Sequence, residues 1–195
     1  MPRYVLKINV KWHCNNTLYI FECGKTRHIT AKQGFLGGKI MKTRVLFICH
    51  GNICRSPMAE FMMKKLVEDR GIADDFYIES AATSTEEIWG AVGNPVYPPA
   101  RDELRRHGID CSGKRARQVR KSDYENFDYL LCAENVNIRN TLRIIGDDPE
   151  GKIKRLLDYS QNPRDIADPW YTGIFDKTYN DIAEGLDAFL EYLGY

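Results

Sequence analysis

The sequence predicts an α/β protein with a four-stranded parallel sheet flanked by helices on both faces. Runs with strand composition alternate with amphipathic helical runs along residues 43–193, which is typical of parallel sheets with right-handed crossovers. The first of these runs, 45–48, is entirely apolar, as expected for a strand that is covered on both faces. A chain of 195 residues, 43% of them hydrophobic, is also long enough for one buried core and an appendage.

The first strand ends at Cys49 and is followed by a short loop and a predicted helix over residues 57–70. Ser56 is a favourable N-cap residue and Pro57 suits the first helical position, so we expect the helix to begin there. Apolar residues then recur at helical spacing, and Gly71 provides a C-terminal stop.

The remaining elements are predicted from the same periodicities and from turn residues. In chain order we expect a strand at 76–81, a long loop at 82–99, a helix at 100–107, a short helix opened by a capping box at 122–125, a strand at 128–133, a helix at 134–143, a strand at 153–157 and a closing helix with apolar residues from 179 to 193. Ligands of such a sheet bind at the carboxyl ends of its strands, and Cys49 lies at one of these ends.

An N-terminal extension, residues 1–40, differs from the rest in charge. It carries seven Lys or Arg residues and one acidic residue, whereas residues 41–195 carry 21 Lys or Arg residues and 26 acidic residues. Three interpretations remain open: a cloning remnant, a start codon assigned too early at a site before Met41, or a basic arm that contacts an acidic partner. Strand-forming residues at 4–10 and 17–21 predict a hairpin within it.

Four potential metal ligands lie in this extension: His13, Cys14, Cys23 and His28. The spacing of the two cysteines matches no familiar zinc pattern, so we predict no metal site. No run is apolar for long enough to span a membrane, and the N-terminus lacks a continuous apolar signal region. We therefore expect a cytoplasmic protein whose six cysteines are reduced.

The loop after the first strand has the composition of an anion-binding site that contains a nucleophile. Gly51 and Asn52 tolerate the backbone angles that turn successive N–H groups inward, and the following helix N-terminus adds partial positive charge. These dipoles and the Arg55 guanidinium favour the thiolate form of Cys49, which is the attacking species. The sequence therefore predicts that Cys49 attacks a bound phosphate.

The spacing of this cysteine and arginine is weak evidence by itself. The same spacing recurs between Cys111 and Arg117. That second pair has neither an apolar strand before it nor a Ser-Pro helix start after it. We therefore interpret Cys111 as an ordinary cysteine.

A phosphocysteine mechanism also needs an acid that protonates the leaving oxygen. Asp168 precedes Pro169, which favours an extended conformation for Asp168, and Trp170 and Tyr171 follow. Such a loop can hold a carboxyl group over a pocket while the aromatic rings flank an aromatic leaving group. An Asp-Pro turn whose aromatic residues pack on the body explains the same residues equally well.

The order of several motifs resembles the low molecular weight protein tyrosine phosphatase family, in its bacterial form. These motifs are Cys-His-Gly-Asn-Ile-Cys-Arg-Ser-Pro at 49–57, Ser-Ala-Ala-Thr-Ser at 80–84, Arg-His-Gly-Ile at 106–109, Ala-Arg-Gln at 116–118 and Asp-Pro-Trp-Tyr at 168–171. The resemblance covers residues 43–193 and implies a four-stranded parallel sheet. It also implies metal-independent hydrolysis of phosphotyrosine through a cysteinyl phosphate, with no cofactor.

The resemblance assigns a role to each matching residue. Cys49 would be the nucleophile, Arg55 the bidentate phosphate clamp, and Asp168 the general acid and later the base. The other residues expected to bind phosphate or substrate are His50, Gly51, Asn52, Ile53, Cys54, Ser56, Trp89, Trp170 and Tyr171, with Ser80 supporting Asn52. Cys54 also resembles the family's second cysteine, which forms a reversible disulfide with the nucleophile, although a packed small residue is the alternative.

Three segments depart from the family pattern. Residues 88–92 contain a small insertion, in which Trp89 either forms a pocket wall or covers the body. Glu134 stands where many members have Asp, and Gly113 and Lys114 replace a segment that contains His in animal members. These changes are expected to alter the site without abolishing it.

Other functions remain as alternatives. Relatives that hydrolyse phosphoarginine tend to carry Thr at the position of Ile53, so Ile53 favours phosphotyrosine. An arsenate reductase needs two further reactive cysteines in a mobile segment, whereas Cys111 and Cys132 are predicted in a turn and a strand. A phosphate-binding module without turnover would lack the nucleophile, the clamp or the acid. We expect a phosphotyrosine-containing protein as the partner, no nucleic acid or membrane, and a monomer or weak dimer.

Overall fold

The computed structural model describes residues 10–13, 17–22, 25–30 and 42–195. The chain divides into two compact units, of which the first is residues 1–42.

The first unit contains a three-stranded antiparallel sheet in the order β1-β2-β3. Its strands are β1 (Val10–His13), β2 (Thr17–Glu22) and β3 (Lys25–Thr30). In the β1–β2 hairpin Val10 lies opposite Ile20. The strand predicted at 4–10 falls, apart from Val10, outside the described residues, as do Cys14 and Cys23. The third strand was not predicted.

The second unit contains the four-stranded parallel sheet that the sequence predicted. Its strands are β4 (Thr43–Cys49), β5 (Phe76–Ala82), β8 (Tyr129–Cys132) and β9 (Ile153–Arg155), in the order β5-β4-β8-β9. β4 is central and pairs in parallel with both β5 and β8. Its side chains from Val45 to Cys49 are all buried, so the apolar run is covered on both faces as expected.

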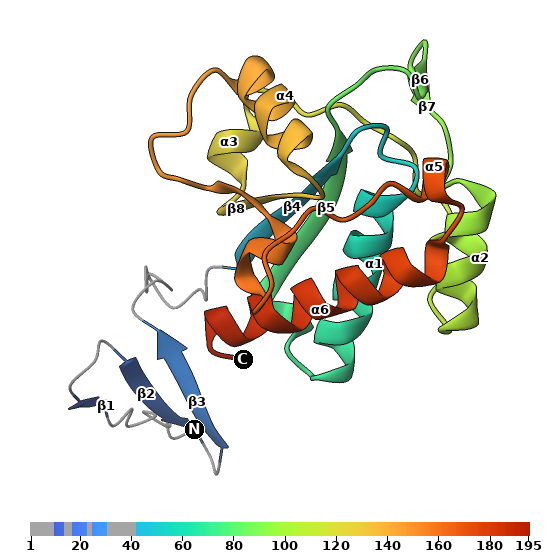
Figure 1. Ribbon diagram of the computed structural model, residues 1–195. Helices are drawn as coiled ribbons and strands as arrows, with labels where there is room; N and C mark the ends of the chain where they lie inside the picture. The colour runs from blue at the N-terminus through green and yellow to red at the C-terminus, as the bar shows by residue number, and fades with distance from the viewer. Residues whose placement is uncertain (1–9, 14–16, 23–24, 31–41) are drawn as a thin grey trace, which may run out of the picture. The chain divides into compact units, whose positions relative to one another are not determined.

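Helices cover both faces of this sheet (Figure 1). On one face Val45 and Phe47 belong to a core shared with α1 (Arg55–Asp69) and α6 (Phe175–Leu193). On the other face Leu46 and Ile48 belong to a second core, against which α3 (Asp123–Asn126) and α4 (Asn135–Ile145) pack. A further helix, α2 (Pro98–Arg106), packs on α1 and α6. None of the helices in the described ranges is both long and apolar enough to cross a membrane.

Two short 3-10 helices, one short α-helix and one small hairpin complete the unit. These are η1 (Ala73–Asp75), η2 (Leu156–Tyr159), α5 (Pro169–Thr172), β6 (Ile88–Trp89) and β7 (Val92–Gly93). The β6–β7 hairpin lies in the segment predicted as an irregular loop. The last strand is shorter than predicted, because residues 156 and 157 belong to η2.

Two predictions about helix caps are wrong. The helix after the cysteine begins at Arg55, with Cys54 as its N-cap residue. Ser56 is therefore not the N-cap residue, and Pro57 is not the first helical residue. The reason is that the Ser56 hydroxyl bonds other side chains within the loop. Ser122 is the N-cap residue of α3 as expected, but the predicted capping box is absent, because Ser122 has a helical backbone conformation and makes no side-chain cap bond.

Candidate active site

Cys49 lies at the carboxyl end of β4, where the chain turns into the loop that leads to α1. We call residues 49–56 the cysteine loop. The Cys49 thiol is 3% exposed, and its Sγ lies 3.0 Å from Ser56 Oγ. It also accepts the Asn52 backbone N–H at 3.3 Å. The sulfur therefore lies within hydrogen-bond distance of one backbone N–H and one hydroxyl group.

Asn52 adopts a left-handed conformation, with φ of 57°, and is the one non-glycine residue of the described chain that does so. Its side chain compensates for this strain. Nδ2 donates to Ser56 Oγ at 2.9 Å and to Ser80 Oγ at 2.8 Å, and Oδ1 accepts the Arg117 backbone N–H at 3.1 Å. Asn52 is fully buried, so these bonds fix the turn of the cysteine loop.

Behind Asn52 lies a charged network that the sequence analysis did not identify. Ser80 Oγ donates to Glu60 Oε2 at 2.6 Å, and Lys114 Nζ lies 2.7 Å from the same oxygen. The Glu60 side chain is only 4% exposed, and an unpaired carboxylate there would be costly. Lys64 binds its other oxygen at 2.5 Å. A charged residue on the buried face of α1 was the sequence signal for this network.

Arg55 is 2% exposed and is held by three acceptors from distant parts of the chain. Nη1 donates to Ile166 O at 3.0 Å and lies 2.7 Å from Glu134 Oε1. Nη2 donates to Asp168 Oδ2 at 2.5 Å. Burial lowers the pKa of Arg55, but the negative charges of Cys49, Asp168 and Glu134 outweigh it and raise the pKa above its usual value.

One donor of this buried guanidinium remains without a partner. Arg55 Nε makes no hydrogen bond in the described structure. A buried donor without an acceptor is costly, so this atom is suited to bind a ligand oxygen. The sequence did not predict that Arg55 pairs with Asp168 or with Glu134, which was noted only as a departure from the family pattern.

Asp168 is the N-cap residue of α5. Its Oδ1 accepts the Trp170 backbone N–H at 3.1 Å, while its other oxygen binds Arg55. The Trp170 ring packs against Tyr97, with ring centroids 4.8 Å apart. Tyr97 in turn donates its backbone N–H to Ile53 O at 2.9 Å, so the acid loop is attached to the cysteine loop through this tyrosine.

Among the remaining predicted binding residues, Ile53 and Cys54 are buried and the others are exposed or half-buried. The His50 ring lies 2.9 Å from Glu86 Oε2, and Gly51 lies close to the Glu87 side chain. Trp89 and Tyr171 are 74% and 86% exposed and make no ring contact within the described residues. Trp89 belongs to β6, and Tyr171 belongs to α5, which follows Asp168.

The described part of the chain contains four free cysteines: Cys49, Cys54, Cys111 and Cys132. Burial and the nearby charges of Cys49 and Asp168 raise the pKa of the Cys54 thiol. Burial likewise raises the pKa of Cys132, to about 12. Cys132 lies within β8 as predicted, and Cys111 is also buried.

The fold and site define an α/β protein with a cysteine and an arginine in one loop at the carboxyl edge of a parallel sheet. Residues 44–194 match the family described as low molecular weight phosphotyrosine protein phosphatase. The chain belongs to this family of hydrolases, as its motifs predicted.

Relatives and solved structures agree with this assignment. The chain is 38% identical over 148 residues to the Bacillus subtilis low molecular weight protein-tyrosine-phosphatase YfkJ, covering 75% of this chain and 92% of the relative. It is 40% identical over 152 residues to the human low molecular weight phosphotyrosine protein phosphatase, covering 75% and 93%. The crystal structure of YfkJ superposes with a TM-score of 0.73, at 36% identity, over 81% of this chain and 98% of that chain. A Drosophila arginine phosphatase superposes with a TM-score of 0.69, at 29% identity, over 77% of this chain and 98% of that chain.

The left-handed conformation of Asn52 generates a stability prediction. Asn52→Gly and Asn52→Ala both lose the side-chain bonds, but alanine also bears the strain of a positive φ, about 1–2 kcal/mol. We expect Asn52→Ala to be less stable than Asn52→Gly by about 1 kcal/mol in urea unfolding. The same pair of changes at exposed Asn162, whose φ is negative, should give the opposite order, because alanine there reduces the entropy of the unfolded chain. Equal stability of the two Asn52 variants would contradict the strain argument.

Proposed function

We propose that the protein is a metal-independent protein tyrosine phosphatase that hydrolyses phosphotyrosine through a cysteinyl-phosphate intermediate. The observation that carries the proposal is the position of Arg55, which is buried between the nucleophile and the acid with its Nε unpaired. A phosphate dianion supplies the oxygen acceptors that this guanidinium lacks. Family membership supports the same reaction class.

In the first step Cys49 Sγ attacks phosphorus and the P–O bond to the leaving group breaks. Arg55 and the backbone N–H groups of the cysteine loop hold the equatorial oxygens, where charge accumulates. The sulfur is aligned by Asn52 N and Ser56 Oγ. The phosphoryl group passes to sulfur, and the ester oxygen leaves with the bonding electron pair.

Asp168 protonates this leaving oxygen. In the ligand-free protein its carboxyl group accepts hydrogen bonds from Arg55 and from the Trp170 N–H. A bound dianion competes for Arg55, so it frees the Asp168 carboxyl group for the leaving oxygen. Substrate binding therefore prepares the acid that the first step consumes.

In the second step the ionised Asp168 takes a proton from water, and the water oxygen attacks phosphorus. The P–S bond breaks and the Cys49 thiolate is restored. The two donors on Sγ stabilise this leaving thiolate, so the same contacts serve both steps. No metal or other cofactor takes part in this scheme.

Phosphotyrosine is favoured as the substrate by the aromatic residues around the loop. Trp170 and Tyr171 follow the acid directly, and Trp89 projects from the β6–β7 hairpin. Their exposed rings provide apolar surface for a phenyl ring and its peptide. Because the nucleophile must stay reduced, we place the protein in the cytoplasm. We expect it to be a monomer or weak dimer.

The test is phosphate release by the reduced full chain, with chelator present, from a phosphotyrosine peptide and from a phosphoarginine peptide. We expect release from phosphotyrosine that is absent in Cys49→Ser. Release from phosphoarginine alone would assign the protein to arginine phosphatases, and a Drosophila member of that class shares the fold. Binding of phosphotyrosine peptide without release would indicate a binding module.

A matched pair of variants tests the acid within the same assay. Asp168→Asn should lower kcat on phosphotyrosine by about 10²- to 10⁴-fold, and by less on para-nitrophenyl phosphate, whose leaving group needs less protonation. The control is Asp165→Asn, because this nearby carboxylate binds Arg155 and the Asn135 N–H instead of Arg55. Similar losses in both variants would remove the acid role.

We further propose that Cys54 protects the nucleophile during oxidation. The Cys49 thiolate takes oxygen from hydrogen peroxide and becomes a sulfenic acid, and the Cys54 sulfur then displaces water to form a disulfide. The charge of Cys49 is one cause of the raised pKa of Cys54, so its oxidation to a neutral group makes Cys54 easier to ionise. A dithiol reductant returns both thiols.

The corresponding prediction concerns recovery after peroxide treatment. Wild type should regain most of its phosphatase activity on addition of dithiol, whereas Cys54→Ser should stay largely inactive after the same exposure. Cys111→Ser, which removes another buried thiol, serves as the control and should recover like wild type. Equal permanent loss in wild type and Cys54→Ser would exclude the protective role.

A further inference from the structure

Positive charge in the second unit is concentrated in one segment. Residues 101–121 contain eight Lys or Arg and three acidic residues, whereas the rest of 43–195 contains 12 Lys or Arg and 23 acidic residues. The segment thus opposes the charge of the remaining unit. Family membership does not account for this distribution, because most of these side chains take no part in the proposed reaction.

The second half of this segment runs along the cysteine loop. Ala116 N donates to Asn94 O at 2.9 Å, beside the β6–β7 hairpin. Arg117 N donates to Asn52 Oδ1 at 3.1 Å. Val119 N donates to Ala82 O at 2.9 Å, at the carboxyl end of β5. Figure 1 shows this part of the chain crossing from α2 to α3 over the ends of the strands.

Three exposed cations on this part of the chain have no acidic partner among the described residues. These are Arg115, Arg120 and Lys121, which we call the basic strip. The other cations of the segment are engaged. Arg117 binds Glu79 and Asp123, and Lys114 binds Glu60.

The carboxylates close to the basic strip form no ion pair with its cations among the described residues. Glu87 accepts the Asn94 side-chain amide at 2.7 Å. Asp123 is buried and accepts the Arg120 backbone N–H, not its guanidinium. Glu125, which is exposed in α3, forms no ion pair with Lys121 within the described residues. The strip therefore presents uncompensated positive charge beside the phosphate site.

We propose that the basic strip binds acidic side chains that flank the phosphotyrosine of the substrate protein. The proposal rests on the proposed function, because the strip borders the same site. From Arg115 to Lys121 the chain spans at most about 20 Å, a length that an extended peptide of six or seven residues matches. Acidic residues on one side of phosphotyrosine can therefore reach the strip while the phosphate occupies the cysteine loop.

Charge complementarity of this kind acts mainly on encounter and selectivity. Exposed ion pairs are individually weak. The attractions between several carboxylates and three cations add up, however, and they accelerate association. The preference should weaken as salt rises, since exposed charges are screened. A phosphate ester without a peptide should not respond to the strip.

The experiment compares kcat/KM of the full-length protein on phosphotyrosine peptides with acidic, neutral and lysine-rich flanks at low salt. Wild type should prefer the acidic peptide over the neutral one by about fivefold or more. The triple variant Arg115→Gln/Arg120→Gln/Lys121→Gln should lose this preference. Its activity on para-nitrophenyl phosphate should stay within about twofold of wild type, because none of the three side chains contacts the reacting groups.

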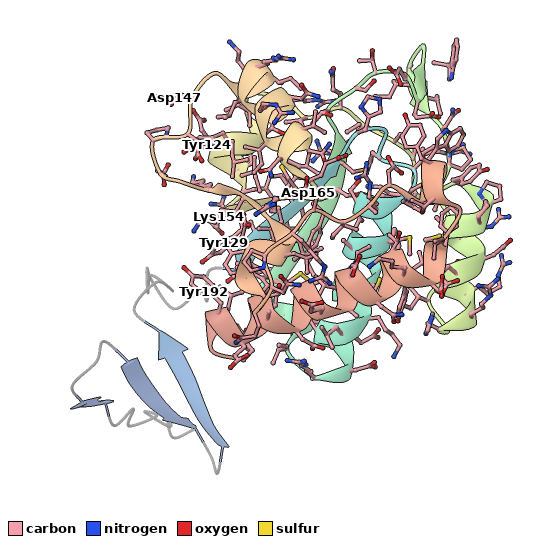
Figure 2. All side chains as sticks on the ribbon, viewed as in Figure 1. Tyr124, Tyr129, Asp147, Lys154, Asp165 and Tyr192 are labelled. Atoms are coloured by element: carbon pink, nitrogen blue, oxygen red, sulfur yellow. The ribbon has the colours of Figure 1, made fainter. Side chains whose placement is uncertain are left out.

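The matched control is Arg139→Gln/Arg143→Gln/Lys154→Gln, which removes the same charge from exposed residues of α4 and β9. Figure 2 places Lys154 on the opposite flank from the β6–β7 hairpin. The control should keep the acidic preference. Equal loss in the two triple variants, or no preference for acidic peptide in wild type, would overturn the proposal.

Two further outcomes are distinguishable. If para-nitrophenyl phosphate is not hydrolysed, the proposed function fails. Equilibrium binding of the same peptides then tests the basic strip: wild type and the control variant should bind the acidic peptide more tightly than the neutral one, and the strip variant should not. If an unphosphorylated acidic peptide or an RNA oligonucleotide binds the strip without competing with phosphotyrosine peptide, the strip serves another anionic partner and the proposal is wrong.

Discussion

The burial of one guanidinium is the constraint on which the site depends. Arg55 is almost inaccessible to solvent, and leaving such a charge unpaired costs about 3–5 kcal/mol. Its acceptors come from the start of α4 and from the segment before α5, which lie far from Arg55 in sequence. Satisfying Arg55 therefore draws Glu134 and Asp168 to the carboxyl edge of the sheet. The proposed acid is positioned by the same interaction that stabilises the buried clamp.

A second constraint is the strained turn at Asn52. Left-handed backbone costs about 1–2 kcal/mol for a residue with a Cβ, and the buried amide offsets this through bonds to both hydroxyls and to Arg117 N. Ser80 is itself fixed by Glu60, whose charge is balanced by Lys114. The geometry around the Cys49 sulfur thus depends on a lysine that lies 65 positions later in the chain.

The sequence predicted those parts of the fold that depend on local periodicity. The strands and main helices follow from apolar spacing, and the position of Cys49 follows from the end of an apolar run. The cap at Ser56 was mispredicted because a hydroxyl can satisfy either a helix end or a neighbouring side chain, and here it binds Cys49 and Asn52. The pairings of Glu60 with Lys114 and of Arg55 with Glu134 were not predicted, since they join residues that only the folded chain brings together. Asp168 was identified through the resemblance, because its local sequence fits an ordinary Asp-Pro turn equally well.

Hydrogen-bond contacts, rather than burial, distinguish one cysteine from its neighbours. Cys54 and Cys132 lie near Cys49, but burial and surrounding negative charge raise the pKa of each, so both remain protonated at neutral pH. Cys49 is equally buried, yet its sulfur accepts the Asn52 N–H and lies 3.0 Å from the Ser56 hydroxyl, and its charge contributes to the raised pKa of Arg55. Solvent exposure therefore does not distinguish the proposed nucleophile. The contacts that converge on its sulfur do, and the strained turn at Asn52 supplies one of them and orients the other through Ser56.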